Sequence, residues 1–212
     1  MTTQPSTRAE RGLQRRIGTT QAERSEATVQ HLLTTARELF ASKGFAETSI
    51  EDIVSTAGVT RGALYHHFGG KADIFRAVVE DEAERLARRL QGAALKEEDP
   101  WRQIEAGCLE FLDACRDPAV RQIGLLDAPA VLGWQELREI DLRHSLALLV
   151  QGLESAMAQG TLRRRPPAPL AHLLFGAMCE AGMLVARATD TRQAMRDVGR
   201  EVRALLGGLT RT

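Results

Sequence analysis

Residues 49–71 constrain the fold of this chain more than any other segment, because they describe two short helices joined by a tight turn. Apolar residues at helical spacing predict a first helix over 49–56 with one buried stripe. The stripe consists of Ile50, Ile53, Val54 and Ala57. Gly58 follows, where a helix C-terminus favours a left-handed residue without a Cβ atom. Thr60 then offers a hydroxyl that can cap the next helix. The segment therefore predicts a helix-turn-helix.

The second helix of this unit, about Arg61–Phe68, is expected to have one apolar face and one polar face. Leu64 and Phe68 lie one turn apart and are expected to anchor the helix in the core. The opposite face is suited to the major groove of DNA, which the second helix of such a unit enters. It consists of Arg61, Gly62, Ala63, Tyr65, His66 and His67. For Tyr65 and His67, packing against the first helix is the alternative role.

The same stretch resembles the DNA-binding domain of the TetR family of bacterial transcriptional regulators. The resemblance covers roughly residues 27–76. It rests on Ala36, Phe40, Gly44, Phe45, Thr48, Ile53, Ala57, Gly58, Val59, Arg61, Gly62, Leu64, Tyr65, His67, Phe68, Lys71 and Phe75. It implies a helical ligand-binding and dimerisation region in the rest of the chain, without indicating the ligand.

Several side chains of this stretch are predicted to contact DNA. Arg61 can bridge O6 and N7 of a guanine, and Ala63 leaves room for a thymine methyl group. Gly62 permits a close backbone approach. The polar side chains of Tyr65, His66 and His67 can donate to phosphates, which fix the register of the protein on DNA. Three further candidates stand near helix starts, where free N–H groups favour phosphate. These are Thr48, Thr60 and Lys71.

The charge balance limits the kind of DNA binding that is possible. A formal net charge of zero excludes a protein that coats DNA through bulk charge, so any DNA-binding surface must be local. The polar residues 1–20 contain four arginines and predict a disordered basic tail, which could also contact DNA. Three cysteines and the lack of a secretory leader favour a cytoplasmic protein. The apolar stretch 170–186 is interrupted by charge and too short for a membrane span.

No segment alternates with a period of two, so the sequence predicts an all-α protein of about nine helices. Three helices form the DNA-binding head, of which the first covers 21–43 and ends at Gly44. One linking helix and five others follow. They are expected over 71–95, 100–116, 118–125, 128–159, 169–189 and 191–209. The predicted domains are the tail 1–20, the helix-turn-helix domain 21–70, and a ligand-binding and dimerisation domain 71–212.

One stripe of the predicted helix 128–159 mixes a large aromatic residue with ionisable groups. It contains Trp134, Leu137, Asp141, His144, Leu148 and Gln151. Ligand cavities are lined by apolar side chains with a few polar ones, so we expect this stripe to face a cavity. The other predicted ligand contacts are Cys108, Phe111, Leu112, Cys115, Met178 and Glu180. The alternative is that Asp141 and His144 are exposed or pair with each other.

The predicted helix 169–189 is apolar nearly all round, so both of its sides are expected to be covered. One side can serve the core of its own subunit. The other side has mostly small residues and is expected to pack, with the last helix, against a second copy of the chain. The predicted dimer contacts are Phe175, Gly176, Cys179, Gly182, Val198, Val202 and Leu205. The resemblance implies the same interface, because TetR relatives dimerise through their last two long helices.

Taken together, the residues and the resemblance predict a ligand-responsive repressor that binds a palindromic DNA operator as a homodimer. A small hydrophobic effector of unknown identity would enter the C-terminal cavity and bias the helix that carries the head. The alternative is a helical ligand carrier or enzyme whose helix-turn-helix is only structural. A regulator that answers to a protein, or to nothing, also stays open. No nucleophile–base pair, phosphate loop or metal-ligand spacing is evident, so we expect no enzyme activity, cofactor or metal.

Overall fold

The computed structural model describes residues 21–210, and every regular element in this range is helical. Nine α-helices and one π-helical segment follow one another within these residues, which confirms the all-α prediction. They are α1 (Gln21–Glu47), α2 (Ile50–Ala57), α3 (Arg61–His67), α4 (Lys71–Ala94), α5 (Pro100–Ala114), η1 (Val120–Asp127), α6 (Ala128–Arg143), α7 (Ser145–Ala158), α8 (Pro167–Arg187) and α9 (Thr191–Thr210). The predicted basic tail lies outside the described residues.

The helix-turn-helix begins and ends at residues whose chemistry suits those positions. Ser49 caps α2 by accepting from the Asp52 backbone N–H at 3.0 Å, while the Asp52 carboxylate accepts from the Ser49 backbone N–H. Gly58 closes α2 in the left-handed conformation, with φ of 63°. Thr60 caps α3 by accepting from the Ala63 backbone N–H at 3.1 Å. The predictions for Gly58 and Thr60 are confirmed.

A cluster of three phenylalanine rings holds the head together. Phe40 lies edge-on to Phe75 with ring centroids 5.0 Å apart, and Phe45 lies 4.9 Å from Phe75. Phe40 and Phe75 are completely buried, together with Leu64 of α3. Gly44 separates Phe40 from Phe45 and breaks the helical path of α1 at φ of 79°, which agrees with the predicted helix end. Phe75 belongs to α4, so the head depends on the next helix for its core.

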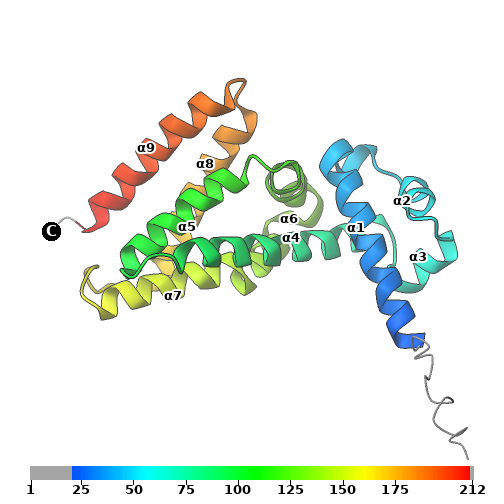
Figure 1. The fold of residues 1–212 in the computed structure, drawn as a ribbon, viewed down its shortest axis with the longest axis horizontal. Coiled ribbons are helices and arrows are strands. Elements are labelled where there is room, and N and C mark those ends of the chain that lie inside the picture. Colours follow the sequence, from blue (N-terminus) through cyan, green and yellow to red (C-terminus); the bar gives the residue numbers. More distant parts are fainter. Residues whose placement is uncertain (1–20, 211–212) are drawn as a thin grey trace, which may run out of the picture.

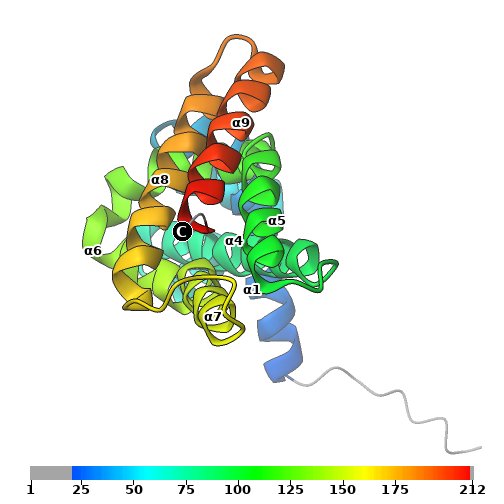
Figure 2. The same ribbon diagram turned by 90° about the vertical axis from the view of Figure 1, so that its left-hand side faces the viewer.

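Helix α4 runs out of the head and along the rest of the molecule (Figure 1). It packs against α1 at one end and against α5, α6 and α7 along its length. The helices α8 and α9 lie side by side in both views, at the end of the molecule away from α2 and α3 (Figures 1 and 2). Beyond the core of the head, the molecule has another hydrophobic core, the second core cluster, which joins α5, α7, α8 and α9. Its buried residues include Leu112, Leu146, Leu153 and Leu206.

Two predicted helices differ from the observed ones. The segment predicted as one helix over 128–159 is divided into α6 and α7 at His144, whose backbone is non-helical (φ −124°, ψ −105°). The His144 ring contacts the Glu80 carboxylate of α4 at 2.6 Å, a contact between residues far apart in the sequence. The short helix expected over 118–125 is largely a π-helix, η1, which continues into α6.

Among residues 21–210, one helix is long and apolar enough to cross a membrane by length and composition alone. This is α8, which packs against α5, α7, α9 and η1. Its buried residues include Leu170, Leu174, Met178 and Val185. Part of the apolar surface of α8 is buried in the second core cluster, while Leu173 and Leu184 stay exposed.

Candidate DNA-binding surface and ligand cavity

The outer face of α3 presents most of the side chains that were predicted to contact DNA. Arg61, Gly62, Tyr65 and His66 are exposed, while Ala63 and His67 are half-buried. Tyr65 is 49% exposed, although aromatic side chains usually bury more of their surface. The structure therefore does not support the alternative in which Tyr65 packs against the first helix of the helix-turn-helix. This face combines a guanidinium, a phenol and an imidazole on one short, capped helix.

Arg61 is held loosely at the start of this face. Its guanidinium Nη2 lies 3.2 Å from Glu51 Oε2, and its Cζ lies 6.0 Å from the centre of the Tyr65 ring. Both partners of the ion pair are more than half exposed, so the pair contributes little to stability. The guanidinium can therefore leave Glu51 for another acceptor at low cost.

Two of the predicted DNA contacts are placed differently by the structure. Thr48 is buried, and its hydroxyl donates to the Gly44 carbonyl at 2.8 Å, so it presents no surface to a phosphate. The Lys71 ammonium donates to the Phe45 carbonyl at 2.8 Å and lies 4.2 Å from the centre of the Phe45 ring. Lys71 thus binds the last turn of α1. Thr60 remains exposed beside its capping bond.

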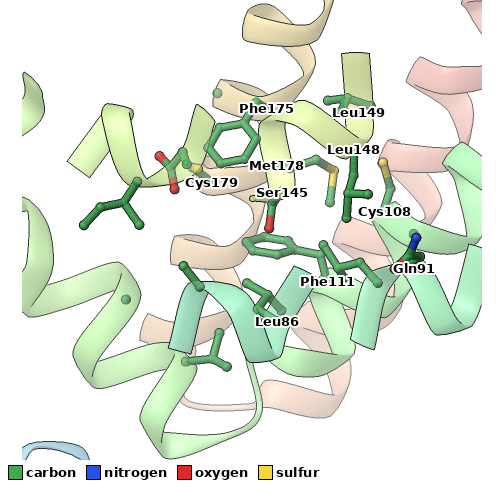
Figure 3. Close-up of a pocket in the computed structure, with 18 of the residues that line it drawn as sticks. Leu86, Gln91, Cys108, Phe111, Ser145, Leu148, Leu149, Phe175, Met178 and Cys179 are labelled. Carbon is green, nitrogen blue, oxygen red and sulfur yellow. The ribbon is translucent and has the colours of Figure 1, made fainter. Parts of the chain in front are cut away.

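A cavity of about 650 Å³ lies between α4, α5, α6, α7 and α8. Its lining is mostly apolar, and Figure 3 shows Leu86, Phe111, Leu148 and Phe175 turned toward a common space. Most of the predicted ligand contacts do line it: Cys108, Phe111, Trp134, Asp141, Leu148, Met178 and Glu180. This volume is in the range of small-molecule sites.

Three predicted ligand contacts do not line the cavity. Leu112 and Cys115 are buried in the helix packing behind it. His144 is turned to Glu80, whose carboxylate also binds Arg143. The guanidinium of Arg143, followed by His144, holds the pKa of Glu80 below its ordinary value. The predicted role of His144 as a ligand contact is therefore wrong.

The polar residues Arg138 and Asp141 lie one turn apart on α6 and both line the cavity. Arg138 was not predicted from the sequence. Its Nη1 lies 3.3 Å from Asp141 Oδ2, a distance that satisfies an ion pair, but the geometry is not that of a hydrogen bond and this nitrogen is buried without a partner. The guanidinium carbon lies 4.4 Å from the centre of the Trp134 ring and 4.8 Å from that of Phe175. Arg138 is thus held between two aromatic faces.

Burial raises the pKa of Asp141 to about 6, and the charges of Arg138 and His144 oppose that rise. The folded chain therefore holds this proton more tightly than the unfolded chain, in which the pKa is near 3.8. The burial penalty is absent when Asp141 is protonated and complete once it is ionised. Stability should consequently fall as pH rises from about 4 to about 6.

We expect this fall of stability with rising pH to disappear in Asp141→Asn. The free energy of unfolding of the wild type, relative to that of the variant, should fall by about 2.5 kcal/mol between pH 4 and pH 8. Urea denaturation at four pH values measures the difference. A difference that stays constant with pH would show that Asp141 titrates normally.

The three cysteines are buried or half-buried free thiols. Burial raises the pKa of Cys108 and Cys115 to about 12, and that of Cys179 to about 11. A thiol reacts as its thiolate, so burial disfavours the reactive form of all three at neutral pH. They serve packing, and Cys108 and Cys179 also line the cavity.

The predicted dimer face of α8 and α9 is largely turned inward. Phe175 and Cys179 line the cavity, and Val202 is buried in the core, against which Val198 also packs. Gly182 is buried, and a Cβ atom there would meet Cys115 Sγ at 2.9 Å and Phe111 Cε1 at 3.0 Å. The small residue at 182 therefore allows close packing within the subunit. Of the predicted set, only Gly176 and Leu205 are exposed.

Contacts between distant parts of the chain join the cavity to the head. Glu82 lines the cavity, is buried, and forms an ion pair with Arg37 of α1. The last residue of η1, Asp127, accepts from the Phe45 backbone N–H at 2.8 Å. Gly124 and Leu125 of the same segment line the cavity. Both connections were invisible in the sequence, because their partners are 45 and 82 residues apart.

Within the part of the chain that the structure describes, no group of three or more His, Cys, Asp and Glu side chains is placed to hold a metal ion.

Comparison with known proteins gives consistent matches over both halves of the chain. Residues 32–78 match the family described as "Bacterial regulatory proteins, tetR family", and residues 101–209 match "Tetracyclin repressor-like, C-terminal domain". The chain is 31% identical over 150 residues to the HTH-type transcriptional regulator SrpR of Pseudomonas putida, covering 66% of each protein. It is 30% identical over 124 residues to the transposon Tn10 TetC protein of Escherichia coli, covering 58% of this chain and 62% of TetC. The matches thus span slightly less than two thirds of these two relatives.

A crystal structure extends the similarity to the whole fold. The TetR-family transcriptional regulator ECA1819 of Pectobacterium atrosepticum superimposes with a TM-score of 0.79 at 33% identity. The match covers 92% of this chain and 99% of that protein.

Proposed function

Because this chain belongs to the TetR family of bacterial transcriptional regulators, we propose that it is a cytoplasmic repressor that binds a palindromic operator as a homodimer. A small hydrophobic effector would bind the cavity between α4 and α8 and release the DNA. The observation that carries this proposal is that α4 contributes both to the core of the head and to the wall of the cavity. Its first turns supply Ile74, Phe75 and Val78 to the core of the head, and its later turns supply Leu86 and Leu90 to the cavity wall.

Two contacts support a coupling between the cavity and the operator-binding surface. An effector that displaces Glu82 would act on Arg37 in the head. One that displaces Leu125 would act on η1, whose Asp127 carboxylate accepts a hydrogen bond from the Phe45 backbone N–H. Each contact ends in α1, against which α2 packs. Effector and operator would then bind with a mutual coupling free energy, which is typically about 1–3 kcal/mol.

The proposal is tested by measuring binding to DNA from the region that flanks the gene of this protein. Fluorescence anisotropy at fixed salt should detect a fragment that binds two chains cooperatively, while a scrambled fragment of the same composition binds at least a hundredfold more weakly. A helical ligand carrier with the same cavity would bind neither fragment specifically. Equal binding to both fragments would contradict the proposal.

The exposed faces of α8 and α9 support a dimer interface that differs from the predicted one. Leu173 and Leu184 lie eleven residues apart on one face of α8 and are 73% and 56% exposed, and Leu205 of α9 is 51% exposed. Gly176 and Ala177 lie between the two leucines on the same face. Figure 2 shows α8 and α9 side by side and turned toward the viewer. Large exposed apolar side chains gathered in this way are typical of subunit contacts.

We expect the double substitution Leu173→Glu and Leu184→Glu to convert a dimer into a folded monomer. The two side chains are exposed in the subunit, so their replacement leaves its core intact, whereas two buried carboxylates in each copy would oppose association. Light scattering coupled to size exclusion would show the mass halved. Leu95→Glu, at a 72% exposed leucine at the end of α4, is the matched control and should remain a dimer. A wild-type monomer at micromolar concentration, or an unchanged dimer in the double variant, would exclude this interface.

A further inference from the structure

Arg138 and Asp141 form a polar centre in the cavity wall, in which hydrogen-bonding groups are left without partners. Arg138 and Asp141 of α6 project beside Cys179 of α8, whose pKa responds to both of their charges. The polar side chain of Gln91 lies at the other side of the cavity, away from Phe175 and Cys179 (Figure 3). Glu82 is occupied by its ion pair with Arg37. Gln103, Ser145, Gln151, Ser155 and Glu180 also line the cavity, but Arg138 and Asp141 are two lining residues of opposite charge that lie beside each other.

Arg138 offers a donor without an acceptor. Its side chain is 15% exposed, and its Nη1 is fully buried with no hydrogen-bond partner. The guanidinium carbon lies over the rings of Trp134 and Phe175, at 4.4 and 4.8 Å from their centres, and these contacts favour its observed position. A buried donor without a partner is costly, so a ligand atom that accepts from it gains affinity.

Asp141 offers an acceptor without a donor. Among the contacts of the described residues, its carboxylate has the ion pair with Arg138 at 3.3 Å but accepts no hydrogen bond. The Asp141 side chain is 20% exposed, so its carboxylate is largely removed from solvent and can accept from a ligand in the cavity. The two side chains together are electrically neutral, and they present an unfilled donor next to an unfilled acceptor.

This arrangement discriminates among ligand head groups. A ligand carboxylate could accept from Arg138 but would lie next to the like charge of Asp141. A ligand ammonium could donate to Asp141 but would lie next to the guanidinium. A hydroxyl group does both at one atom: its oxygen can accept from the Arg138 guanidinium while its proton is donated to the Asp141 carboxylate.

The rest of the lining selects the body of the ligand. Phe111, Leu148, Leu149 and Met178 line the same cavity (Figure 3). An aromatic ring suits such a lining, because it buries a large apolar area and can pack against Phe111 and Phe175. A phenolic hydroxyl, with a pKa near 10 like that of tyrosine, stays neutral and a strong donor at pH 7.5.

Resting on the proposed effector site, we propose that the ligand of this cavity is an uncharged hydroxylated aromatic compound, a phenol, whose oxygen accepts from Arg138 and donates to Asp141. The inference concerns the chemical class of the effector.

The test compares four probes that share one skeleton and differ in the head group. Naphthalene, 2-naphthol, 2-naphthoate and 2-naphthylmethylamine are titrated into the full chain at pH 7.5 without DNA, and affinity is measured by calorimetry. We expect 2-naphthol to bind at least tenfold more tightly than each of the other three. The proposal is overturned if naphthoate or the amine binds as tightly as 2-naphthol, if naphthol and naphthalene bind equally, or if none of the four binds.

Two variants locate the preference in the polar centre. Arg138→Met keeps an unbranched side chain that can pack between the two rings but removes the donor, and should bring 2-naphthol to within about threefold of naphthalene. Asp141→Asn should lower the preference as well, and it serves if Arg138→Met fails to fold. Glu139→Gln changes an exposed carboxylate of α6 that does not line the cavity and should leave the preference unchanged. A tenfold preference that survives in both polar-centre variants would overturn the assignment of Arg138 and Asp141.

The absence of DNA separates this inference from the proposed function. Selective naphthol binding by a chain that fails to bind its operator would refute the regulator and leave the ligand class standing. Operator binding by a chain without naphthol selectivity would support the regulator and refute the ligand class.

Discussion

Replacing Arg37 with alanine is expected to lower the free energy of unfolding by about 3 kcal/mol. The Glu82 carboxylate is 7% exposed and binds the Arg37 guanidinium through two hydrogen bonds, Nε to Oε1 and Nη2 to Oε2. These contacts and the Glu82 charge raise the pKa of Arg37 above its ordinary value. Without Arg37 the buried carboxylate would keep only Arg85, whose Nε lies 3.8 Å away. Urea denaturation at pH 7.5 measures the loss.

Two further variants identify the cause of that loss. Arg85→Ala removes a 51% exposed guanidinium from the same neighbourhood and should cost less than about 1 kcal/mol. The double variant Arg37→Met with Glu82→Leu replaces the pair by apolar side chains and should recover at least half of the stability lost in Arg37→Ala. An Arg37→Ala protein as stable as the wild type would show that Glu82 is solvated in solution.

Replacing Arg61 with alanine is expected to weaken operator binding roughly tenfold to a hundredfold and to reduce discrimination against scrambled DNA. The reason is that a guanidinium reading a guanine supplies about 1–3 kcal/mol of discrimination. Arg61 is 59% exposed and pairs only with the exposed Glu51, so thermal unfolding should be unchanged. Anisotropy titrations on operator and scrambled fragments, at one salt concentration, measure both affinities.

Arg88→Ala is the matched control for Arg61→Ala. Arg88 is 58% exposed and pairs with one exposed carboxylate, that of Glu84, but it lies on α4 outside the helix-turn-helix. Its removal should change neither affinity by more than about twofold. If Arg61→Ala behaves like Arg88→Ala, then α3 does not read bases through Arg61.

The head could be predicted from the sequence because its signals are local. Gly58 and Thr60 act on backbone groups within four residues, and the observed helix ends lie within one residue of the predicted ones. Thr48 and Lys71 were assigned to phosphates for the same reason, since both stand near helix starts. Their actual partners, the Gly44 and Phe45 carbonyls, belong to the end of α1, and that contact depends on the packing of α1 against the turn.

The cavity could be predicted only in part. The stripe with Trp134 and Asp141 indicated the correct face of α6, and Arg138 lies on that same stripe, four residues after Trp134 and three before Asp141. A cation at that spacing was an available signal for the polar centre. By contrast, nothing local could show that His144 contacts Glu80 or that Gly182 packs against α5. Small residues on α8 are equally compatible with packing inside a subunit and between subunits.

The π-helical form of η1 has a consequence for how a signal could cross the molecule. Segments of this kind are rare and differ from an α-helix by one extra residue in the turn. If η1 relaxed to α-helical geometry, each side chain after the relaxed turn would rotate by about 100° around the axis. Asp127 would then turn away from the Phe45 N–H, while Gly124 and Leu125 would change the cavity wall in the same event. The segment η1 contacts both the cavity and the head. Because a change from π-helix to α-helix shifts the register by a whole residue, such a change would transmit a signal in a discrete step.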